Sequence, residues 1–155
     1  MQESDVTIRD VPIPGHGGND FIHEIRVKGE REGLPVIVMI HGYMSGGMQF
    51  CKMMKSLRKN YEVVTCDLLG MGASSRSYFP EEELKSFDGT MNFFINSIYK
   101  WTKATNIGQN GAKFHLLGHS MGGTIAGHYA LAHPEQCETL ILMSAVGVGE
   151  MPEHL

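Results

Sequence analysis

The sequence predicts an α/β fold whose sheet is mostly parallel, with antiparallel strands at its N-terminal end. Short apolar runs of strand length alternate along the chain with segments of helical periodicity, a pattern typical of parallel sheets covered by helices on both faces. Glycine-rich loops follow three of the apolar runs. With 155 residues, 42% hydrophobic and 19% charged, the chain has the composition of one globular domain.

The first strands are expected to form the antiparallel part of the sheet. Residues 5–13 and 21–28 have strand-like patterns, and the turn-rich segment 14–20 separates them. Residues 35–40, PVIVMI, form a continuous apolar run, as expected for a strand buried on both faces. A helix is predicted over residues 47–59, where apolar residues recur on one face.

The next elements continue this alternation. Residues 63–66 are a further buried-strand candidate, and residues 88–105 carry an apolar stripe of helical period. Between them, residues 79–83 resemble the start of a short helix, with a proline and acidic residues in its first turn. The last strand is expected to begin at Thr139 and end at Met143. The apolar stripes are interpreted as core and not as cofactor sites.

The segment FHLLGHSMGG, residues 114–123, is the most informative part of the sequence. A strand-like run leads into G-x-S-x-G at Gly118, Ser120 and Gly122, and a helical pattern follows over residues 121–133. In such a strand–turn–helix unit the serine occupies a strained turn, and the flanking glycines lack side chains because they press against neighbouring elements. The pattern predicts Ser120 as a nucleophile.

The helix expected after Ser120 has two further consequences. Its first backbone N–H group, that of Met121, is aimed at the region above the serine, where it can stabilise negative charge on a substrate carbonyl oxygen. Small residues at helical spacing suit the same helix to close packing on a sheet, at Gly123, Gly127, Ala126 and Ala130.

A second oxyanion donor is expected in the loop after residues 35–40, which begins His41-Gly42-Tyr43-Met44. The amide of Tyr43 is the first candidate and that of Met44 the alternative. We interpret His41 and Gly42 as structural parts of the site, because a histidine at the end of that strand more often braces the loop by hydrogen bonding than transfers protons.

A third loop begins at Asp67, in DLLGMGASSRS. Gly70 and Gly72 superficially suggest a dinucleotide-binding fingerprint, but Ser75 occupies the place of its third glycine and no helix pattern follows directly. We therefore expect no cofactor, and no metal site is predicted. Asp67 is interpreted as a loop organiser whose carboxylate accepts local backbone N–H groups.

Taken together, the H-G loop, the D-x-x-G-x-G-x-S loop and G-H-S-x-G-G resemble the α/β-hydrolase superfamily over roughly residues 20–150. More narrowly, DLLGMGASSRS and LLGHSMGG resemble the subfamily of lysophospholipid and N-acylphosphatidylethanolamine lipases, with its lipid-droplet co-activator and lysophosphatidate acyltransferase relatives. The resemblance implies an α/β-hydrolase fold and hydrolysis of a carboxylic ester, of a lipid in particular. Some relatives carry asparagine at the nucleophile position, whereas this chain has Ser120.

The rest of a catalytic triad is not expected within this chain. In the family the acid and the histidine follow the serine on later strands, but only 35 residues follow Ser120, and none is aspartate. His119 is expected to point away from Ser120, and His115, His128 and His133 to lie away from it. His154 on the tail is the one candidate that geometry leaves open. We therefore expect residues 1–155 to be the N-terminal part of a single hydrolase domain, nearly inert alone.

Three functions remain open at this point. The first is a serine acyl hydrolase whose lid, acid and histidine come from a longer product or from the other half of a split enzyme. The second is a noncatalytic hydrolase-fold subunit used for binding or assembly. The third, which follows from the resemblance alone, is a lysophospholipid acyltransferase. In each case we expect a partner segment to cover the strand that ends at Met143, since it would otherwise leave an open sheet edge.

Charge and cysteine content limit the partners further. A net charge of −4 gives no basic surface for nucleic acid. No apolar run approaches the ~20 residues that span a bilayer, and no secretion signal is visible, although peripheral membrane or lipid-droplet contact fits a lipid substrate. The chain has three cysteines without metal-type spacing, which we expect to be buried thiols in a reducing, cytoplasmic compartment: Cys51, Cys66 and Cys137.

Overall fold

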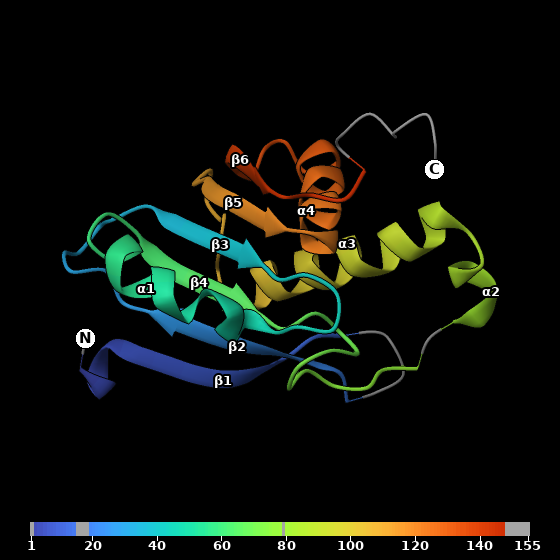
Figure 1. Cartoon of the computed structure of the whole chain (residues 1–155), viewed down its shortest axis with the longest axis horizontal. Helices are drawn as coiled ribbons and strands as arrows, with labels where there is room; N and C mark the ends of the chain where they lie inside the picture. The colour runs from blue at the N-terminus through green and yellow to red at the C-terminus, as the bar shows by residue number, and fades with distance from the viewer. Residues whose placement is uncertain (1, 15–18, 79, 148–155) are drawn as a thin grey trace.

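The computed structural model of the chain describes residues 2–14, 19–78 and 80–147. Its elements follow the alternation that the sequence predicts (Figure 1). The strands are β1 (Val6–Pro12), β2 (Phe21–Val27), β3 (Val36–Ile40), β4 (Glu62–Cys66), β5 (Phe114–His119) and β6 (Cys137–Met143). The helices are α1 (Cys51–Leu57), α2 (Glu81–Leu84), α3 (Phe87–Ala104) and α4 (Met121–Ala132), with 3-10 turns η1 (Glu3–Asp5) and η2 (Gly47–Phe50).

The six strands form one sheet in the order β1-β2-β4-β3-β5-β6. The pairs β1–β2 and β2–β4 are antiparallel, whereas β4–β3, β3–β5 and β5–β6 are parallel. This confirms the mostly parallel sheet with antiparallel N-terminal strands. The strands β4, β3 and β5 are neighbours and parallel, so their carboxyl ends lie at the same end of the sheet. The three loops singled out in the sequence follow these strands and therefore lie near one another.

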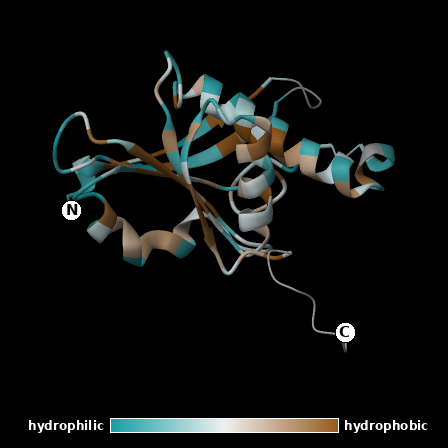
Figure 2. Ribbon diagram, turned by 90° about the horizontal axis from the view of Figure 1, so that it is seen from above, coloured by the Kyte–Doolittle hydropathy of each residue, from teal (hydrophilic) through white to brown (hydrophobic). Residues whose placement is uncertain are grey.

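The sheet is buried on both faces, as the continuous apolar run in β3 predicts. Val38 and Ile40 belong to a core cluster with residues of α3 and α4, whereas Ile37 and Met39 belong to a second cluster with Phe50 and α1. Side chains alternate between the faces of a strand, so both faces of β3 must be covered. Figure 2 shows the hydrophobic strands running between helices on both sides.

The helices differ from the expected boundaries only at their ends. The segment expected as one helix over residues 47–59 begins as the 3-10 turn η2 and becomes α1 only at Cys51. Phe50 of η2 and Met54 of α1 both pack on the sheet. Pro80 precedes α2 as its N-cap and does not lie in the first turn. None of the described helices combines the length and the hydropathy that a membrane span requires.

All three cysteines were expected to be buried, and this is confirmed only for Cys66. Cys66 at the end of β4 is fully buried, and burial raises its pKa well above the ordinary thiol value. Cys137 is half-buried at the start of β6, and Cys51 is exposed. The sequence places Cys51 on a helix but does not show that it faces away from Phe50 and the core.

A buried carboxylate joins the antiparallel strands to α3. Glu24 on β2 is fully buried, and its Oε1 accepts hydrogen bonds from Nε of Arg9 and Nε of Arg26, each at 3.0 Å. Its Oε2 accepts the indole N–H of Trp101 at 2.9 Å. A buried charge is tolerated only when it is paired and hydrogen-bonded in this way.

We expect Glu24→Ala to lower the free energy of unfolding by about 3–5 kcal/mol, because it removes the acceptor of the Trp101 N–H, of the Arg9 guanidinium and of the Arg26 Nε, although Arg26 keeps its pair with Glu62. Urea denaturation measures this change. The matched control is Arg9→Ala, which removes one half-exposed partner and should cost no more than about 1 kcal/mol. Equal losses for the two variants would contradict the assignment of Glu24 as the centre of the network.

Candidate active site

Ser120 lies on a strained turn between β5 and α4. Its backbone has φ 55° and ψ −124°, outside the conformations that non-glycine residues usually adopt. The turn is held on both sides, since the Ser120 amide donates to the Met143 carbonyl at 3.1 Å and its carbonyl accepts from the Val146 amide at 3.2 Å. Ser120 is half-buried and its Oγ has no hydrogen-bond partner in the described part of the chain.

The glycines that flank Ser120 sit where no side chain fits. A Cβ at Gly118 would clash with the carbonyl oxygen of Gly122 and would come within 2.6 Å of the Gly123 Cα. A Cβ at Gly122 would clash with the His41 carbonyl oxygen and would lie 2.5 Å from that of Ile40. Backbone atoms cannot yield as a flexible side chain can, so α4 approaches β5 and the end of β3 only through glycine.

The sequence led us to expect that the small residues of α4 all pack on the sheet. This is wrong for Gly127. Gly123 and Ala126 do pack on it, because a Cβ at Gly118 on β5 would lie 2.6 Å from the Gly123 Cα and 2.7 Å from the Ala126 Cβ. Gly127 is different, because a Cβ there would meet nothing within 4 Å. It lines an open groove of about 290 Å³ between α4 and β6, together with Leu131 and Leu142.

The loop after β3 reaches Ser120 through Gly42. A Cβ at Gly42 would lie 3.1 Å from the Ser120 Cβ and 3.2 Å from the His119 Nδ1. Beyond it the chain makes a turn in which the Ser45 amide donates to the Gly42 carbonyl at 3.3 Å and Met44 has φ 53°. This turn leaves the amides of Tyr43 and Met44 without an acceptor among the described residues.

The amide of Met121 is the third free donor near the serine. Met121 is the first residue of α4, so its N–H has no acceptor within the helix, and no described residue outside the helix accepts it. Met121 directly follows Ser120, and Tyr43 and Met44 directly follow Gly42, whose backbone lies beside the Ser120 turn. Free N–H groups at a helix N-terminus and in an adjacent loop favour a developing negative charge.

His41 braces this loop from below. It is fully buried; its Nε2 accepts the Leu68 amide at 2.8 Å, and its Nδ1 lies 2.7 Å from the Gly42 carbonyl oxygen. Because Nε2 is the acceptor, the ring is neutral and carries its proton on Nδ1. Burial lowers the pKa of His41 below its usual value, although the Gly42 carbonyl and the Asp67 charge act in the opposite direction.

Asp67 connects the loop after β3 to its own loop. Its Oδ1 accepts the Gly47 amide at 2.6 Å and its Oδ2 accepts the Ala73 amide at 2.7 Å. Gly72, with φ 52°, leaves room for this carboxylate, since a Cβ there would clash with Oδ2. The sequence alone does not identify Gly47 and Ala73 as partners of Asp67, because linear order does not show that the two loops meet.

The other described histidines are engaged elsewhere or turned toward other neighbours. His115 contacts the Tyr61 ring, His128 the Phe87 ring and His133 the Tyr99 ring. His23 pairs with Asp10 across β1 and β2. His119 differs from these: it is the last residue of β5, and its buried Nδ1 has no hydrogen-bond partner and lies near Gly42. His16 and His154 lie outside the described residues, so the geometry considered for His154 stays a prediction.

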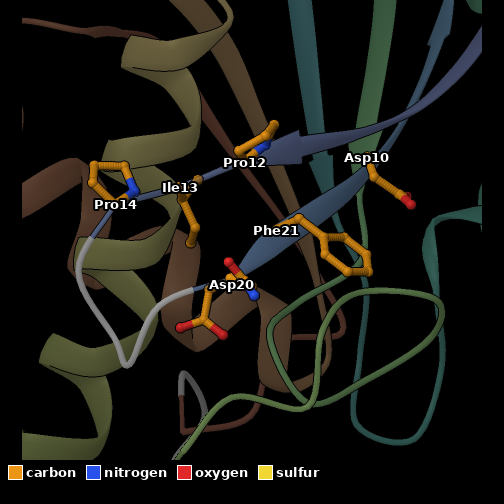
Figure 3. A pocket seen from close by; sticks show the side chains of 7 residues that line it. Asp10, Pro12, Ile13, Pro14, Asp20 and Phe21 are labelled. Atoms are coloured by element: carbon orange, nitrogen blue, oxygen red, sulfur yellow. The ribbon is translucent and has the colours of Figure 1, made fainter.

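Two further features bear on ligands. A pocket of about 470 Å³ lies where β1 ends and β2 begins, and Pro12, Ile13 and Phe21 are among the residues that line it (Figure 3). In the sheet, β4 and β3 lie between β2 and β5, the strand that leads to the Ser120 turn. We therefore do not assign this pocket to the Ser120 site. In the described ranges, no three His, Cys, Asp or Glu side chains are grouped so that they could hold a metal ion.

The fold is shared with known proteins. A family profile described as "alpha/beta hydrolase fold" matches residues 35–155. A probable 1-acylglycerol-3-phosphate O-acyltransferase from Oryza sativa subsp. japonica is 39% identical over 134 residues, which cover 86% of this chain and 30% of the rice protein. The human (lyso)-N-acylphosphatidylethanolamine lipase is 33% identical over 133 residues, which cover 86% of this chain and 36% of the lipase.

Solved structures share the fold. A bacterial membrane phospholipase A superposes with a TM-score of 0.74 at 27% identity, covering 97% of this chain and 43% of the phospholipase chain. A serine hydrolase from a hydrocarbon-degrading Cycloclasticus bacterium superposes with a TM-score of 0.77 at 20% identity, covering 95% and 48% of the two chains.

Ser120 lies on a turn between a strand of a mostly parallel sheet and a helix, and the loop after β3 lies beside that turn. This arrangement is typical of α/β hydrolases. The chain belongs to the α/β-hydrolase family. It spans about a third of the length of the rice and human relatives.

We expect Gly122→Ala to destabilise the protein by about 2–3 kcal/mol, because its Cβ would meet the β3 backbone. The matched control on the same helix is Gly127→Ala, which should stabilise it by about 0.5–1 kcal/mol, since alanine favours the helix and nothing opposes it there. Thermal and urea unfolding measure both. A Gly122→Ala variant as stable as Gly127→Ala would contradict the close contact of α4 with β3.

Protonation of His41 should make stability depend on pH. The folded state holds His41 neutral, so below the ordinary histidine pKa of about 6.5 the unfolded chain binds a proton that the folded chain does not. We therefore expect the free energy of unfolding to fall as pH decreases below that value, by at most about 1.4 kcal/mol per pH unit for this group. His41→Gln should reduce this slope, whereas His128→Gln on α4 should retain it. Identical slopes would contradict a buried neutral His41.

Proposed function

We propose that this chain carries the nucleophile and the oxyanion donors of a serine hydrolase that cleaves carboxylic esters. The observation that supports it most is the free Ser120 Oγ on a positive-φ turn, with unpaired amides of Met121 on one side and of Tyr43 and Met44 on the other. A strained turn is retained where it performs a function, and here it exposes the serine beside free donors.

The proposed reaction proceeds through an acyl-enzyme. Ser120 Oγ attacks the ester carbonyl carbon and transfers its proton to a base, while the carbonyl electron pair moves onto the oxygen. The Met121 amide and the Tyr43 or Met44 amide donate to that oxygen. The carbon–oxygen bond to the alcohol then breaks, and the alcohol leaves with the proton. Attack by water, deprotonated by the same base, releases the acid and restores the serine.

The base and its orienting acid are proposed to come from outside the residues described here. Within the described part of the chain, no histidine nitrogen is hydrogen-bonded to Ser120 Oγ. The relatives are about three times as long as the matched segment, which leaves room in a longer product for a histidine, an acid and a lid. Without the histidine, turnover should fall by about a million-fold.

A lipid ester is the proposed substrate class. The loop beside Ser120 carries large apolar side chains in solvent, with Tyr43 68% exposed and Met44 82% exposed. Exposed apolar groups around a reactive serine fit an acyl chain or a lipid surface, which would bring the protein into peripheral contact with membranes or lipid droplets. The similarity to a probable 1-acylglycerol-3-phosphate O-acyltransferase from rice and to the human (lyso)-N-acylphosphatidylethanolamine lipase also supports a lipid substrate.

Acyl transfer is the second candidate, and the 39% identity with the probable rice acyltransferase favours it. The same acyl-Ser120 would form, but the hydroxyl group of a lysophospholipid would replace water in the second step. A noncatalytic assembly role is the third, and it is favoured by β6, a sheet edge whose Ile141 and Leu142 are exposed.

We expect a fluorophosphonate probe to label Ser120 in the longer product that contains this chain, and Ser120→Ala to abolish both labelling and ester hydrolysis, because the probe reacts only with an activated serine. Intact mass and peptide mapping locate the label. Ser45→Ala, in the adjacent loop, is the matched control and should still label.

A folded longer product that is never labelled at Ser120 would reject the catalytic proposal and leave the assembly role. If labelling occurs, product analysis with a lysophospholipid acceptor separates the two catalytic candidates. Free fatty acid as the only acyl product supports hydrolysis, whereas a diacyl product supports transfer.

A further inference from the structure

The segment 144–147, which follows β6, lies against the first turn of α4. A Cβ at Gly123 would lie 2.5 Å from the Ala145 Cβ and 3.0 Å from the Ala145 Cα, so this close contact requires glycine on the helix. The segment bends at both of its ends, where Ser144 has φ 47° and Gly147 has φ 79°. The chain therefore returns from the end of β6 to the helix that begins directly after Ser120.

Val146 connects this segment to α4 through both of its backbone polar groups. Its amide donates to the Ser120 carbonyl at 3.2 Å, and its carbonyl accepts the Thr124 hydroxyl at 2.6 Å. The Val146 side chain is 58% exposed, so burial of apolar surface contributes little to holding this residue. The position of Val146 therefore depends on these two hydrogen bonds.

Thr124 is the fourth residue of α4, and its hydroxyl does not make the bond that is common inside helices. A helical threonine hydroxyl often donates to the carbonyl four residues earlier, which for Thr124 is that of Ser120. The Ser120 carbonyl already accepts the amides of Gly123 at 2.9 Å, Val146 at 3.2 Å and Thr124 at 3.4 Å. The Thr124 hydroxyl donates to Val146 instead, and so links the helix to a segment 22 residues further along the chain.

These hydrogen bonds form a closed ring at the Ser120 carbonyl. The amides of Thr124 and Val146 both donate to this carbonyl, and the Thr124 hydroxyl completes the ring by donating to the Val146 carbonyl. On the other side of the turn, the Ser120 amide donates to Met143 at the end of β6. Ser120 has φ 55°, a strained conformation that persists only where neighbouring groups hold it. The ring is one of the two attachments that hold it.

We propose that Thr124 is a positioning residue of the Ser120 site, whose hydroxyl holds the segment 144–147 on α4 and thereby keeps the Ser120 turn in its reactive conformation. This inference rests on the proposed function and adds to it a residue that acts through Val146 and not on the substrate. Without the hydroxyl, the segment separates from the helix more often, and the Ser120 carbonyl then loses the Val146 amide. The turn becomes free to relax, which displaces the Ser120 Oγ relative to the Met121 amide.

Amide hydrogen exchange in the 155-residue chain tests this attachment without catalysis. Thr124→Val has nearly the same shape as the parent but no hydroxyl, and we expect it to speed exchange of the Val146 amide by about tenfold, because the open state becomes more populated when one hydrogen bond is lost. Thr124→Ala should give the same acceleration. Thr124→Ser keeps a hydroxyl and should exchange within about twofold of the parent. Nitrogen–proton NMR spectra follow the Val146 signal.

Thr90 provides the matched control. It is likewise the fourth residue of its helix, α3, but its hydroxyl donates to the carbonyls of Ser86 and Leu84, neither of which belongs to the segment 144–147. Thr90→Val removes the same chemical group and should leave the exchange rate of the Val146 amide unchanged. An unchanged Val146 rate in folded Thr124→Val, or an equal acceleration in Thr90→Val, would overturn the inference.

In the longer product, the same variants separate this inference from the proposed function. Thr124→Val should lower both the rate of fluorophosphonate labelling at Ser120 and kcat for a carboxylic ester by about tenfold, with KM changed by less than about twofold, because a displaced nucleophile affects the chemical step more than binding. Thr124→Ser should restore both rates. Labelling of Thr124→Val at the parent rate would reject the positioning role alone. A parent product that is never labelled would reject the proposed function, whatever the exchange at Val146.

Discussion

The contact of Gly122 with the carbonyl oxygens of Ile40 and His41 is the constraint on which the rest of the site depends. It lets α4 approach the end of β3, so the turn that carries Ser120 must lie beside the loop that follows β3. Gly118 likewise lets α4 pack closely on β5, because a Cβ at this position would clash with the carbonyl oxygen of Gly122. The strain at Ser120 is tolerated because both ends of the turn are held, through hydrogen bonds to Met143 and Val146.

Two buried polar groups then set the shape of the loops around the serine. His41 connects the end of β3 to the amide of Leu68, and Asp67 connects the loop after β3 to the loop after β4. Both use side-chain acceptors to satisfy backbone amides that the turns would otherwise leave unpaired. The amides of Tyr43, Met44 and Met121 are among those that no described residue accepts, and they lie in the two segments that adjoin the Ser120 turn. The proposed chemistry uses these free donors.

The same loops produce an electrostatic contrast. The carboxylate of Asp67 is enclosed by amides, whereas the guanidinium of Arg76 is held by carbonyls on one edge and open on the other. Gly127, Leu131 and Leu142 line a groove between α4 and β6, and β6 is the last strand of the sheet.

Local patterns in the chain were sufficient to predict the order of strands and helices, the burial of β3 on both faces and the need for glycine at the serine turn. Each of these features depends on residues that are neighbours in sequence. Only the tertiary structure shows the partners of Asp67 and His41, the exposure of Cys51, the uncovered face at Gly127 and the free edge of Arg76. Each of these depends on which loops and faces meet after the strands pair in the order β1-β2-β4-β3-β5-β6. A linear pattern specifies the side chain that a position carries, but the register of distant strands decides which atoms that side chain reaches.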